Sequence, residues 1–509
     1  MKVLIIYPNV HNTSRINLGI AYLSACLKKH GHEVKLFDTT FYKEKGEMSD
    51  EDFRSKSLQV TDVDLFEQGV TYRHSKFMIN DLKSLIQDFK PDILGLNCVD
   101  ATYNLGKKLL ESVQDFKIFT IAGGARVSVD PESVIAEKYV NAICVGEGEE
   151  TFVELCEKIE RGNIESIRNL WIKTKNKVIK SNRRPLIDID TLPMPDWDIF
   201  SDLHLIRPMA GKAYRMGSFD MSRGCPYKCS YCANQFYAEL NKGYGNYCRQ
   251  KNPELLIQEI KHKVQKYNLN FIMFYDDLFP TNEYIDKFCD LYGEIGLPFY
   301  VNMRPEVVKE KTVKKLYDVG LCSVGIGVES GDESFRKKIL NRNYSNQVVI
   351  NAFNIMKQFK IRTSSFNIIG SPFETRENIF NTIKLNKEIM PASSTVSYFY
   401  PYRGTPLRKT SIEAGFFNPA EEETMDIAHR TGSALIMPQI SPEEISFLFM
   451  KFQLFVKLPR LFWPLIKYTE KENTIAGYLS KALIEIFNWL NKKNAVWTFP
   501  VKKSISSVS

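Results

Sequence analysis

Three cysteines lie within one short loop, and their spacing is the feature of this chain that most directly suggests chemistry. Cys225, Cys229 and Cys232 follow one another at C-x3-C-x2-C spacing, in a segment that also contains Gly224 and Pro226. Iron–sulfur clusters are normally held by four cysteine thiolates, so three thiolates would leave one iron with an open coordination site. An open iron indicates chemistry at the cluster and not electron storage alone.

Zinc is the first competing interpretation of this loop. A structural zinc site takes four ligands, usually from two pairs of Cys or His residues. No second pair lies nearby, and Cys248 is the only close candidate for a fourth ligand. The other alternative is that the three cysteines are simply buried and structural.

The segment from Ser222 to Cys232 resembles the cluster loop of the radical S-adenosylmethionine superfamily. That signature is C-x3-C-x-aromatic-C, and Tyr231 takes the aromatic position. The resemblance implies a [4Fe-4S] cluster whose fourth iron is chelated by S-adenosylmethionine. Reduction would then cleave this cofactor to a 5′-deoxyadenosyl radical, with electrons from a donor such as flavodoxin or ferredoxin.

Composition places the chain among ordinary globular proteins, with 44% hydrophobic and 25% charged residues. Lys plus Arg exceed Asp plus Glu by 68 − 60 = 8, without a concentrated basic run, so no nucleic-acid partner is expected. The cysteines outside the loop are scattered, which is not the pattern of a disulfide framework. No signal peptide and no long uncharged apolar stretch are found, so we expect a cytoplasmic protein.

Strands and helices alternate in the first part of the chain. The expected strands are 3–7, 33–37, 92–97, 118–122 and 142–145, and the expected helices are 18–29, 104–116, 131–137 and 150–161. This alternation predicts a doubly wound parallel sheet, flavodoxin-like in size, over residues 1–162. Residues 41–75 are a polar insertion to which the sequence assigns no role.

The strand ends of this unit carry the candidate ligand-binding residues, because open parallel sheets bind ligands at the carboxyl ends of their strands. A dinucleotide is poorly supported, since no G-x-G-x-x-G follows a strand. Together with the cluster loop, the unit resembles the cobalamin-binding domain of one radical S-adenosylmethionine subfamily. The matching segments are 18–23, 31–34, 123–125 and 145–149.

The resemblance implies bound cobalamin, and the residues that we expect to contact it are Pro8, Asn9, Gly19, Asn97, Gly123, Gly124, Gly146, Glu147 and Gly148. For each glycine the alternative is an ordinary tight turn. Cobalamin mutases carry an Asp-x-His-x-x-Gly loop whose histidine binds cobalt, and no such motif occurs here. The resemblance therefore implies cobalamin held without a histidine ligand, and we interpret His30 and His32 as solvated turn residues.

A second repeating unit follows an arm and a proline-rich linker over residues 163–212. After the strand that leads into the cluster loop, the expected strands are 271–275, 299–303, 322–328, 364–369 and 395–400. Six strands over residues 213–410 are too few for a complete eight-unit barrel and predict a partial TIM-type (β/α)6 barrel. By resemblance, the residues expected to bind S-adenosylmethionine are Tyr231, Asp276, Asp277, Glu329, Ser330, Ile368 and Gly370. The role of Arg342 is left open.

Residues 411–509 are expected to be mainly helical, because apolar residues recur at helical spacing around 447–456 and 475–490. One interpretation is that these helices cap the open side of the barrel. The alternative is contact with a membrane surface, or a pocket for a large apolar substrate.

These patterns predict a cobalamin-dependent radical S-adenosylmethionine enzyme, most simply a methyltransferase acting on an unactivated carbon of a small-molecule or lipid-like substrate. Related chemistry without methyl transfer, such as cyclisation or rearrangement, is the alternative. A cobalamin- or cluster-dependent sensor without enzymatic activity is the third possibility. The substrate is not defined by the sequence, because fold and cofactors do not fix it.

Overall fold

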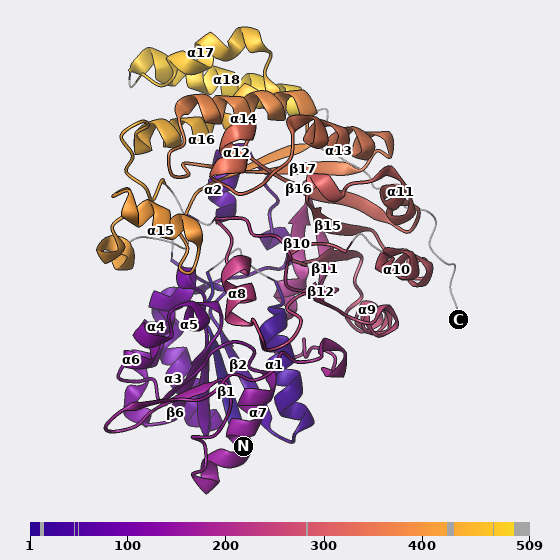
Figure 1. Cartoon of the computed structure of the whole chain (residues 1–509). Helices are drawn as coiled ribbons and strands as arrows, with labels where there is room; N and C mark the ends of the chain where they lie inside the picture. Colours follow the sequence, from indigo (N-terminus) through magenta and orange to yellow (C-terminus); the bar gives the residue numbers. More distant parts are fainter. Residues whose placement is uncertain are drawn as a thin grey trace.

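The computed structural model of the chain describes residues 1–10, 15–44, 46–48, 50–280, 283–424, 432–471 and 473–492. Its architecture is built on two seven-stranded sheets (Figure 1). The first sheet belongs to the N-terminal part of the chain and the second to the middle part. The C-terminal helices lie at the end of the molecule farthest from the first sheet.

The first sheet has the strand order β2-β1-β5-β6-β7-β8-β9. Its strands are β1 (Lys2–Tyr7), β2 (Glu33–Asp38), β5 (Ile93–Asn97), β6 (Phe119–Gly123), β7 (Ala142–Cys144), β8 (Leu170–Lys173) and β9 (Val178–Lys180). The first five are parallel, whereas β8 and β9 add antiparallel to the edge. The order of the parallel strands confirms the predicted flavodoxin-like fold.

Helices cover both faces of this sheet, which explains why its parallel strands read as nearly continuous apolar runs. The helices are α1 (Leu18–Lys29), α3 (Met78–Phe89), α4 (Asp100–Ser112), α5 (Ala125–Val129), α6 (Pro131–Ala136) and α7 (Glu149–Lys158). α1 and α7 pack on one face, and α3 to α6 pack on the other. Lys90 ends α3 in the left-handed region, and Asn17 caps the start of α1.

The insertion at residues 41–75 reaches from the first sheet to the far edge of the second. It contains β3 (Tyr42–Lys43), α2 (Asp50–Lys56) and β4 (Arg73–His74). Phe53 stacks on Phe449 with 5.3 Å between ring centres. The Gln59 side chain accepts a hydrogen bond of 2.9 Å from the backbone N–H of Val396. The insertion therefore covers an edge strand that would otherwise expose unpaired backbone groups.

The proline-rich linker is firmly packed. Trp197 is buried between Phe219 and Tyr267, at ring-centre distances of 5.2 and 5.4 Å. The carboxylate of Asp196 accepts a 2.6 Å hydrogen bond from Ser24 of α1. The Lys263 ammonium donates to the carbonyl of residue 195 at 2.7 Å. The linker thus fixes α1 against the second sheet instead of acting as a flexible tether.

The second sheet has the order β10-β11-β14-β15-β16-β17-β18. Its strands are β10 (Ile206–Met209), β11 (Lys212–Phe219), β14 (Phe271–Phe274), β15 (Phe299–Met303), β16 (Leu321–Glu329), β17 (Arg362–Ile369) and β18 (Ser393–Tyr398). From β11 to β18 neighbouring strands are parallel, and β10 is antiparallel to β11. These six parallel strands confirm the predicted partial barrel.

The segments that connect these strands are mostly helical. They comprise α8 (Asn234–Leu240), α9 (Pro253–Tyr267), α10 (Tyr284–Tyr292), α11 (Glu310–Asp318), α12 (Glu333–Lys338), α13 (Asn346–Gln358) and α14 (Arg376–Ile389), and α15 (Pro406–Glu413) follows the last strand. The two short strands β12 (Ser222–Arg223) and β13 (Arg249–Gln250) pair antiparallel to each other on either side of the cysteine loop.

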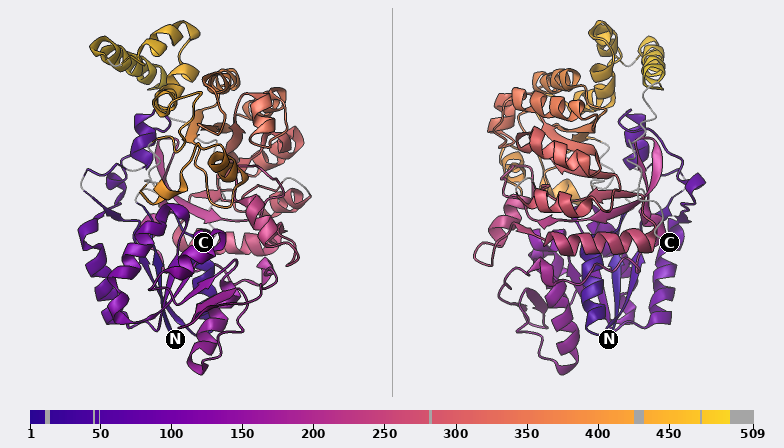
Figure 2. Two further views of the ribbon diagram at one scale, coloured as in Figure 1. Left: turned by 60° about the vertical axis from the view of Figure 1, so that its left-hand side comes forward. Right: turned by 90° about the vertical axis from the view of Figure 1, so that its right-hand side faces the viewer.

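Three helices follow the barrel: α16 (Pro442–Lys457), α17 (Trp463–Tyr468) and α18 (Thr474–Lys492). α16 packs on β18 and α14, with Tyr398 and Phe449 stacked at 4.2 Å. α17 and α18 lie outside α16 and project from the body of the molecule (Figure 2). Among the described residues, no helix combines the length and apolar character needed to cross a membrane.

Candidate functional site

The cysteine loop lies between β12 and α8, at the rim of the second sheet. Gly224 precedes the first cysteine with φ of +89°, and a side chain there would collide with the backbone of Tyr247. Ser230 anchors the loop, because its N–H donates to the carbonyl of Leu340 and its carbonyl accepts from the N–H of Leu407. Burial raises the pKa of the Cys225 thiol to about 11. A metal centre would reverse this effect, because coordination deprotonates a thiol.

Arg304, directly after β15, donates a hydrogen bond to a cysteine of the loop. Its Nη1 donates to the Cys229 sulfur at 3.0 Å. Its guanidinium lies 3.7 Å from the centre of the Tyr227 ring. Its Nε donates to the Glu306 carboxylate at 3.0 Å, which fixes the guanidinium plane from the other side. The Cys229 sulfur thus accepts a charge-assisted hydrogen bond from Arg304. The side-chain amide of Asn234 lies 3.7 Å from the Cys232 sulfur.

Glu329 and Tyr231 are joined by Arg342, whose role the sequence left open. The Arg342 Nη1 lies 2.5 Å from the Glu329 carboxylate and 2.9 Å from the Tyr231 hydroxyl oxygen. Glu329 has φ of +63°, a backbone conformation that costs free energy for a residue other than glycine. The resulting network connects the aromatic position of the cysteine loop to the end of β16.

The remaining residues predicted to bind S-adenosylmethionine occupy different environments. Ser330 is fully buried and its hydroxyl accepts a 3.3 Å bond from the N–H of Asp332. Asp276 is also buried, and its Oδ1 accepts bonds from the Met221 N–H and the Ser222 hydroxyl at 2.9 and 2.6 Å. Asp277 is exposed at the rim, where it accepts hydrogen bonds from Asn234 and Gly224.

Burial raises the pKa of Asp276 to about 7, and its Oδ2 has no partner among the described residues. Ile368 is half-buried near the end of β17. Gly370 follows with φ of +79°. The structure thus brings Tyr231 and Glu329 together and places Asp277 beside the loop. Binding of S-adenosylmethionine by these residues stays a prediction.

Glu374, which the sequence did not single out, closes the turn after β17. Its side chain is fully buried, and its Oε2 accepts from the N–H groups of Gly370 and Ser371 at 2.6 and 3.1 Å. Burial raises the pKa of this carboxyl to about 8.

We expect Glu374 to contribute a loss of stability as pH rises from about 4.5 to 8, at about 1.4 kcal/mol per pH unit. The folded state keeps the Glu374 proton up to about pH 8, whereas the unfolded chain releases it near pH 4.5. Glu374→Gln keeps an oxygen acceptor for both amides and removes this titration. Thermal unfolding from pH 5 to 8 should therefore show a flatter loss of stability in the variant. Parallel pH profiles for the two proteins would contradict the expectation.

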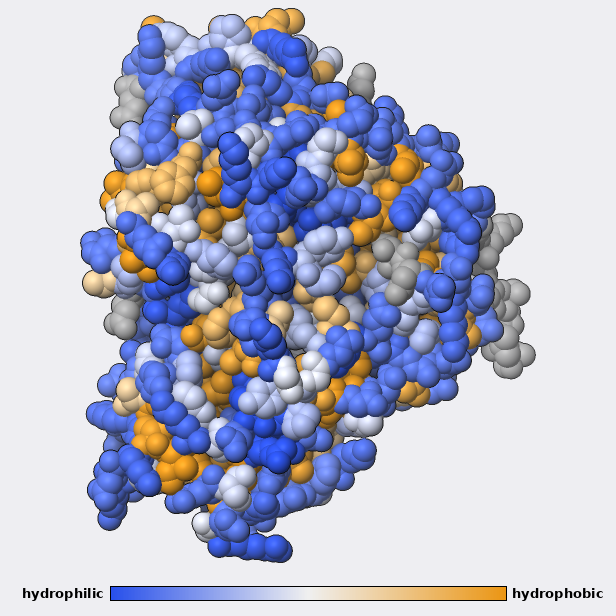
Figure 3. Space-filling view, in the orientation of Figure 1, coloured by the Kyte–Doolittle hydropathy of each residue, from blue (hydrophilic) through white to orange (hydrophobic). Residues whose placement is uncertain are grey.

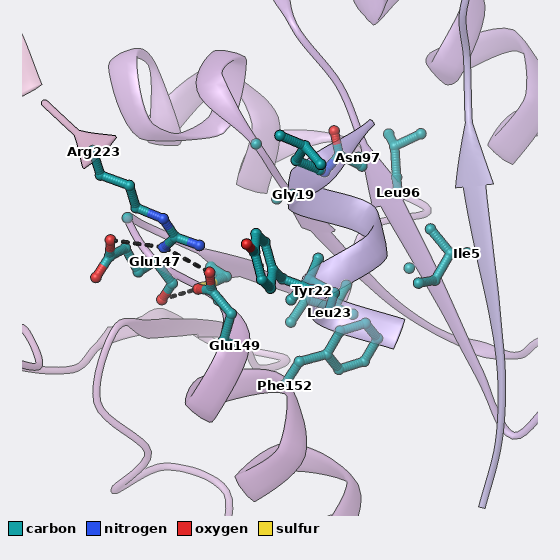
Figure 4. Close-up of a pocket in the computed structure, with 18 of the residues that line it drawn as sticks. Ile5, Gly19, Tyr22, Leu23, Leu96, Asn97, Glu147, Glu149, Phe152 and Arg223 are labelled. Atoms are coloured by element: carbon teal, nitrogen blue, oxygen red, sulfur yellow. Dashed lines mark hydrogen bonds and ion pairs between the residues drawn. The ribbon is translucent and has the colours of Figure 1, made fainter. Parts of the chain in front are cut away.

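One cavity of the first sheet has a volume of about 280 Å³ and lies between the sheet, α1 and α7 (Figure 4). Its apolar wall includes Ile5, Leu23, Leu96 and Phe152. Gly95 opens the cavity in the middle of β5, because a Cβ there would meet the Phe152 ring at 3.0 Å. The cavity has apolar walls, and at the glycines its wall is formed by backbone. A cavity of this kind fits a bulky planar or ring-containing group.

Seven of the residues predicted to contact cobalamin line this cavity: Gly19, Asn97, Gly123, Gly124, Gly146, Glu147 and Gly148. Pro8 and Asn9 do not line it. Asn9 is buried and bonds to Thr39 and Thr40, and Pro8 packs against Gly106 of α4. None of the described residues that line the cavity is a histidine. His30 and His32 flank the turn between α1 and β2, at the opposite edge of the sheet.

Two residues of the barrel complete the cavity wall, and the sequence analysis did not identify them as ligand contacts. They are Asp220, just after β11, and Arg223, two residues before Cys225. Arg223 forms ion pairs with Glu147 at 3.1 Å and Glu149 at 2.8 Å (Figure 4). Arg223 therefore belongs to the wall of the cavity and lies only two residues before the first cysteine of the loop.

A second buried charge cluster joins the two sheets at their rims. Arg403, in the loop after β18, lies 3.6 Å from Asp100 and 3.3 Å from Asp130 of the first unit, and also pairs with Glu422. Arg126 shares both aspartates, at 3.5 and 2.8 Å. The carboxylates of Asp100 and Asp130 thus lie between the guanidiniums of Arg126 and Arg403. These ion pairs hold the carboxyl edge of the first sheet against the barrel.

Two family models match the chain. Residues 219–385 match the radical SAM superfamily, and residues 13–156 match the B12 binding domain. An uncharacterised methyltransferase of Pyrococcus horikoshii is 26% identical over 429 residues, covering 81% of this chain and 83% of the relative. The anaerobic magnesium-protoporphyrin IX monomethyl ester cyclase of Cereibacter sphaeroides is 23% identical over 430 residues, covering 80% of this chain and 63% of the relative.

Two solved structures share the fold. The cobalamin-dependent S-adenosylmethionine radical enzyme OxsB matches with a TM-score of 0.62 at 14% identity, over 97% of this chain and 71% of its own. The radical S-adenosylmethionine methyltransferase TsrM from Kitasatospora setae matches with a TM-score of 0.58 at 15% identity, over 81% of this chain and 76% of its own. Both likenesses concern the arrangement of the two sheets.

Proposed function

Because the chain belongs to the radical S-adenosylmethionine superfamily and carries a B12-binding domain ahead of its partial barrel, we propose that it is a methyltransferase that acts on an unactivated carbon. It is a cobalamin-dependent radical S-adenosylmethionine enzyme, and its cofactors are a [4Fe-4S] cluster, S-adenosylmethionine and cobalamin. Methylation is the finer part of this statement and the part that needs testing.

The residues present fit these cofactors. Cys225, Cys229 and Cys232 would hold the cluster, and the glycine-lined cavity between α1, α7 and the sheet would hold part of cobalamin. When bound, the cluster and S-adenosylmethionine supply a carbon-centred radical, and cobalamin supplies a carrier for a methyl group. The protein would position these groups, supply Arg304 as a donor at the Cys229 sulfur, and shield the site from water.

One observation carries the proposal most strongly. The cavity of the first sheet includes Arg223, which lies two residues before the first cluster cysteine. With cobalamin in this cavity and the cluster at the cysteine loop, this shared wall would bring a methyl carrier and a radical source close to each other. A sensor that used only one cofactor would not require this arrangement.

The second candidate function is ring formation or rearrangement without methyl transfer. It is favoured by the similarity to the Cereibacter sphaeroides cyclase, which spans four-fifths of this chain. Methylation is favoured by the methyltransferase of Pyrococcus horikoshii, which matches at higher identity and covers more of the relative. Both candidates need a low-potential electron donor such as flavodoxin or ferredoxin, and both leave the substrate's identity open.

Anaerobic reconstitution with iron, sulfide and cobalamin, followed by S-adenosylmethionine with a deuterated methyl group, tests the proposal. We expect 5′-deoxyadenosine in the presence of a reductant, and products that carry the labelled methyl group when a small-molecule extract is added. Cys229→Ser is the control and should form no 5′-deoxyadenosine. Products without label would favour the cyclase-like reaction. An intact cluster that yields no 5′-deoxyadenosine would count against enzymatic function.

A further inference from the structure

The two C-terminal helices α17 and α18 form a projecting arm that touches the body of the protein along one side only. The inner side of α18 packs through Ala476, Leu483 and Phe487, which are at most 8% exposed. These positions are seven and four residues apart and therefore share one helix face. The inner face packs with α16 in the hydrophobic cluster that continues into the barrel.

Large hydrophobic side chains also cover the outer side of the arm. Of the seventeen exposed large hydrophobic residues in the described part of the chain, six fall between 461 and 490: Leu461, Leu465, Ile475, Tyr478, Trp489 and Leu490. Leu461, Ile475 and Tyr478 are 72, 67 and 70% exposed. Figure 3 shows hydrophobic side chains at the upper margin of the molecule, where Figure 1 places α17 and α18. A surface with this many exposed large hydrophobic residues indicates a binding surface.

The outer residues of α18 lie on one stripe. Ile475, Tyr478 and Trp489 are separated by three and eleven residues, which places all three within about 60° on a helix of 3.6 residues per turn. Lys481 and Glu485 fall beside this stripe in the helical projection. The same helix therefore has one apolar face against the protein and a second apolar face that points outward, with charged residues along its border. An ordinary surface helix has only the first.

Charge distinguishes this end of the chain from the rest. Residues 458–492 contain five Lys and Arg and three Glu, a net charge of +2, and the sequence of residues 493–509 adds three lysines, whereas the whole chain carries +8. Of the three acidic residues, Glu470 is paired with Arg376 at 2.6 Å. Arg460, Lys467, Lys471 and Lys481 are exposed around the apolar residues. The surface that would meet this arm is therefore expected to be anionic as well as apolar.

We propose that the outer face of α17 and α18 docks on the surface of an anionic lipid bilayer. An amphipathic helix with aromatic and aliphatic residues on one side and lysines at its border lies in the plane of the headgroups and buries its apolar side. Tyr and Trp favour this interface because their rings are apolar and their tips polar. Lysines near an anionic leaflet add attraction that salt screens. The arm binds the membrane peripherally and does not cross it.

Membrane docking requires none of the cofactors. A negative result in the docking experiment would therefore not contradict the proposed reaction. The test below distinguishes membrane docking from three alternatives, in which the surface binds a second copy of the chain, a partner protein or residues 493–509. A second copy would carry the same positive charge on its own arm, which opposes pairing of the two surfaces. Residues 493–509 add three further lysines and no acidic residue.

The test is co-sedimentation of the full-length protein with vesicles of phosphatidylglycerol and phosphatidylcholine. We expect binding to phosphatidylglycerol vesicles that weakens with added salt, and at least about tenfold weaker binding to phosphatidylcholine alone. Ile475→Ser combined with Tyr478→Ser should lower partitioning about tenfold. Phe66→Ser is the matched control, because Phe66 is 66% exposed beside Tyr72 on the insertion and belongs to neither α17 nor α18. Its binding should equal that of the wild-type protein.

Circular dichroism and cobalamin content would show that the double variant is folded. Equal partitioning of the double variant and the wild-type protein would overturn the proposal, as would absence of the wild-type protein from phosphatidylglycerol pellets. A dimer in light scattering that the double variant abolishes would assign the face to a second copy and overturn it. Deletion of residues 493–509 should leave binding within a few-fold of wild type, and its complete loss would refute docking through α17 and α18.

Discussion

Replacing Gly95 by leucine is expected to abolish cobalamin binding while the iron–sulfur cluster is retained. Gly95 lies in the middle of β5 and lines the cavity of the first sheet. A Cβ alone would already touch the Phe152 ring at 3.0 Å, so the three further carbons of leucine would occupy the cavity. The visible spectrum of bound cobalamin and the iron content after reconstitution would measure the two effects on the same sample.

Gly95→Ala is the graded control for this substitution. One carbon can be accommodated by a small rotation of the Phe152 ring, so binding should weaken without being lost. Thermal unfolding would show whether the leucine variant is folded. A folded Gly95→Leu protein that retains full cobalamin content would show that the cavity does not receive the cofactor. Cleavage of S-adenosylmethionine should persist in this variant, because the cysteine loop is unchanged.

The second large effect is expected at Arg304. Arg304→Gln should lower the reduction potential of the cluster by about 60 mV, equivalent to a tenfold change in the reduction equilibrium of a one-electron couple. Hydrogen bonds and positive charge at the ligating sulfurs stabilise the more negative, reduced cluster. Arg304 provides both, with its Nη1 at 3.0 Å from the Cys229 sulfur. A redox titration monitored by electron paramagnetic resonance would give the potential directly.

Two further variants separate this effect from a general loss of structure. Arg304→Lys keeps the charge but cannot stack flat on Tyr227 while bonding Glu306, so its potential should fall between the other two. Arg376→Gln removes a partly exposed guanidinium that pairs with Glu444 and Glu470 on the C-terminal helices. Its potential should remain at the wild-type value. An unchanged potential in Arg304→Gln with a full iron complement would refute this role of Arg304.

Much of the fold was predictable because most strands of both sheets are parallel, and several of them are buried on two faces. Their strands therefore stand out as short apolar runs, such as β1 and β14. Three helices of the described first unit were not predicted, namely α2, α3 and α5, and α3 is the longest of them. α3 carries Met78, Leu82, Ile86 and Phe89 at helical spacing, but it starts directly after a 3-10 turn and without a side-chain N-cap. Its position next to the polar insertion concealed the pattern.

The cysteine loop was predictable because its ligands are adjacent in sequence, whereas the partners of the site are not. Arg342 meets Tyr231 across 111 residues and Glu329 across 13. Arg304 meets Cys229 across 75 residues. No spacing rule connects such pairs, since they depend on how the strands are ordered in the sheet. The same reason explains why Pro8 and Asn9 were predicted at the cavity and lie outside it: the ends of neighbouring strands point to different sides of the carboxyl edge.

The insertion that covers β18 has a consequence for the order in which the protein forms during synthesis. The bond between Gln59 and Val396 spans 337 residues. At translation rates of 5 to 20 residues per second, roughly 20 to 70 s separate the appearance of the two partners. For that interval the first sheet can fold, but Phe53 and its neighbours wait on the ribosome-bound chain without the surface that will bury them. Phe449, which stacks on Phe53, is made later still, so the nascent protein exposes this hydrophobic segment until α16 is made.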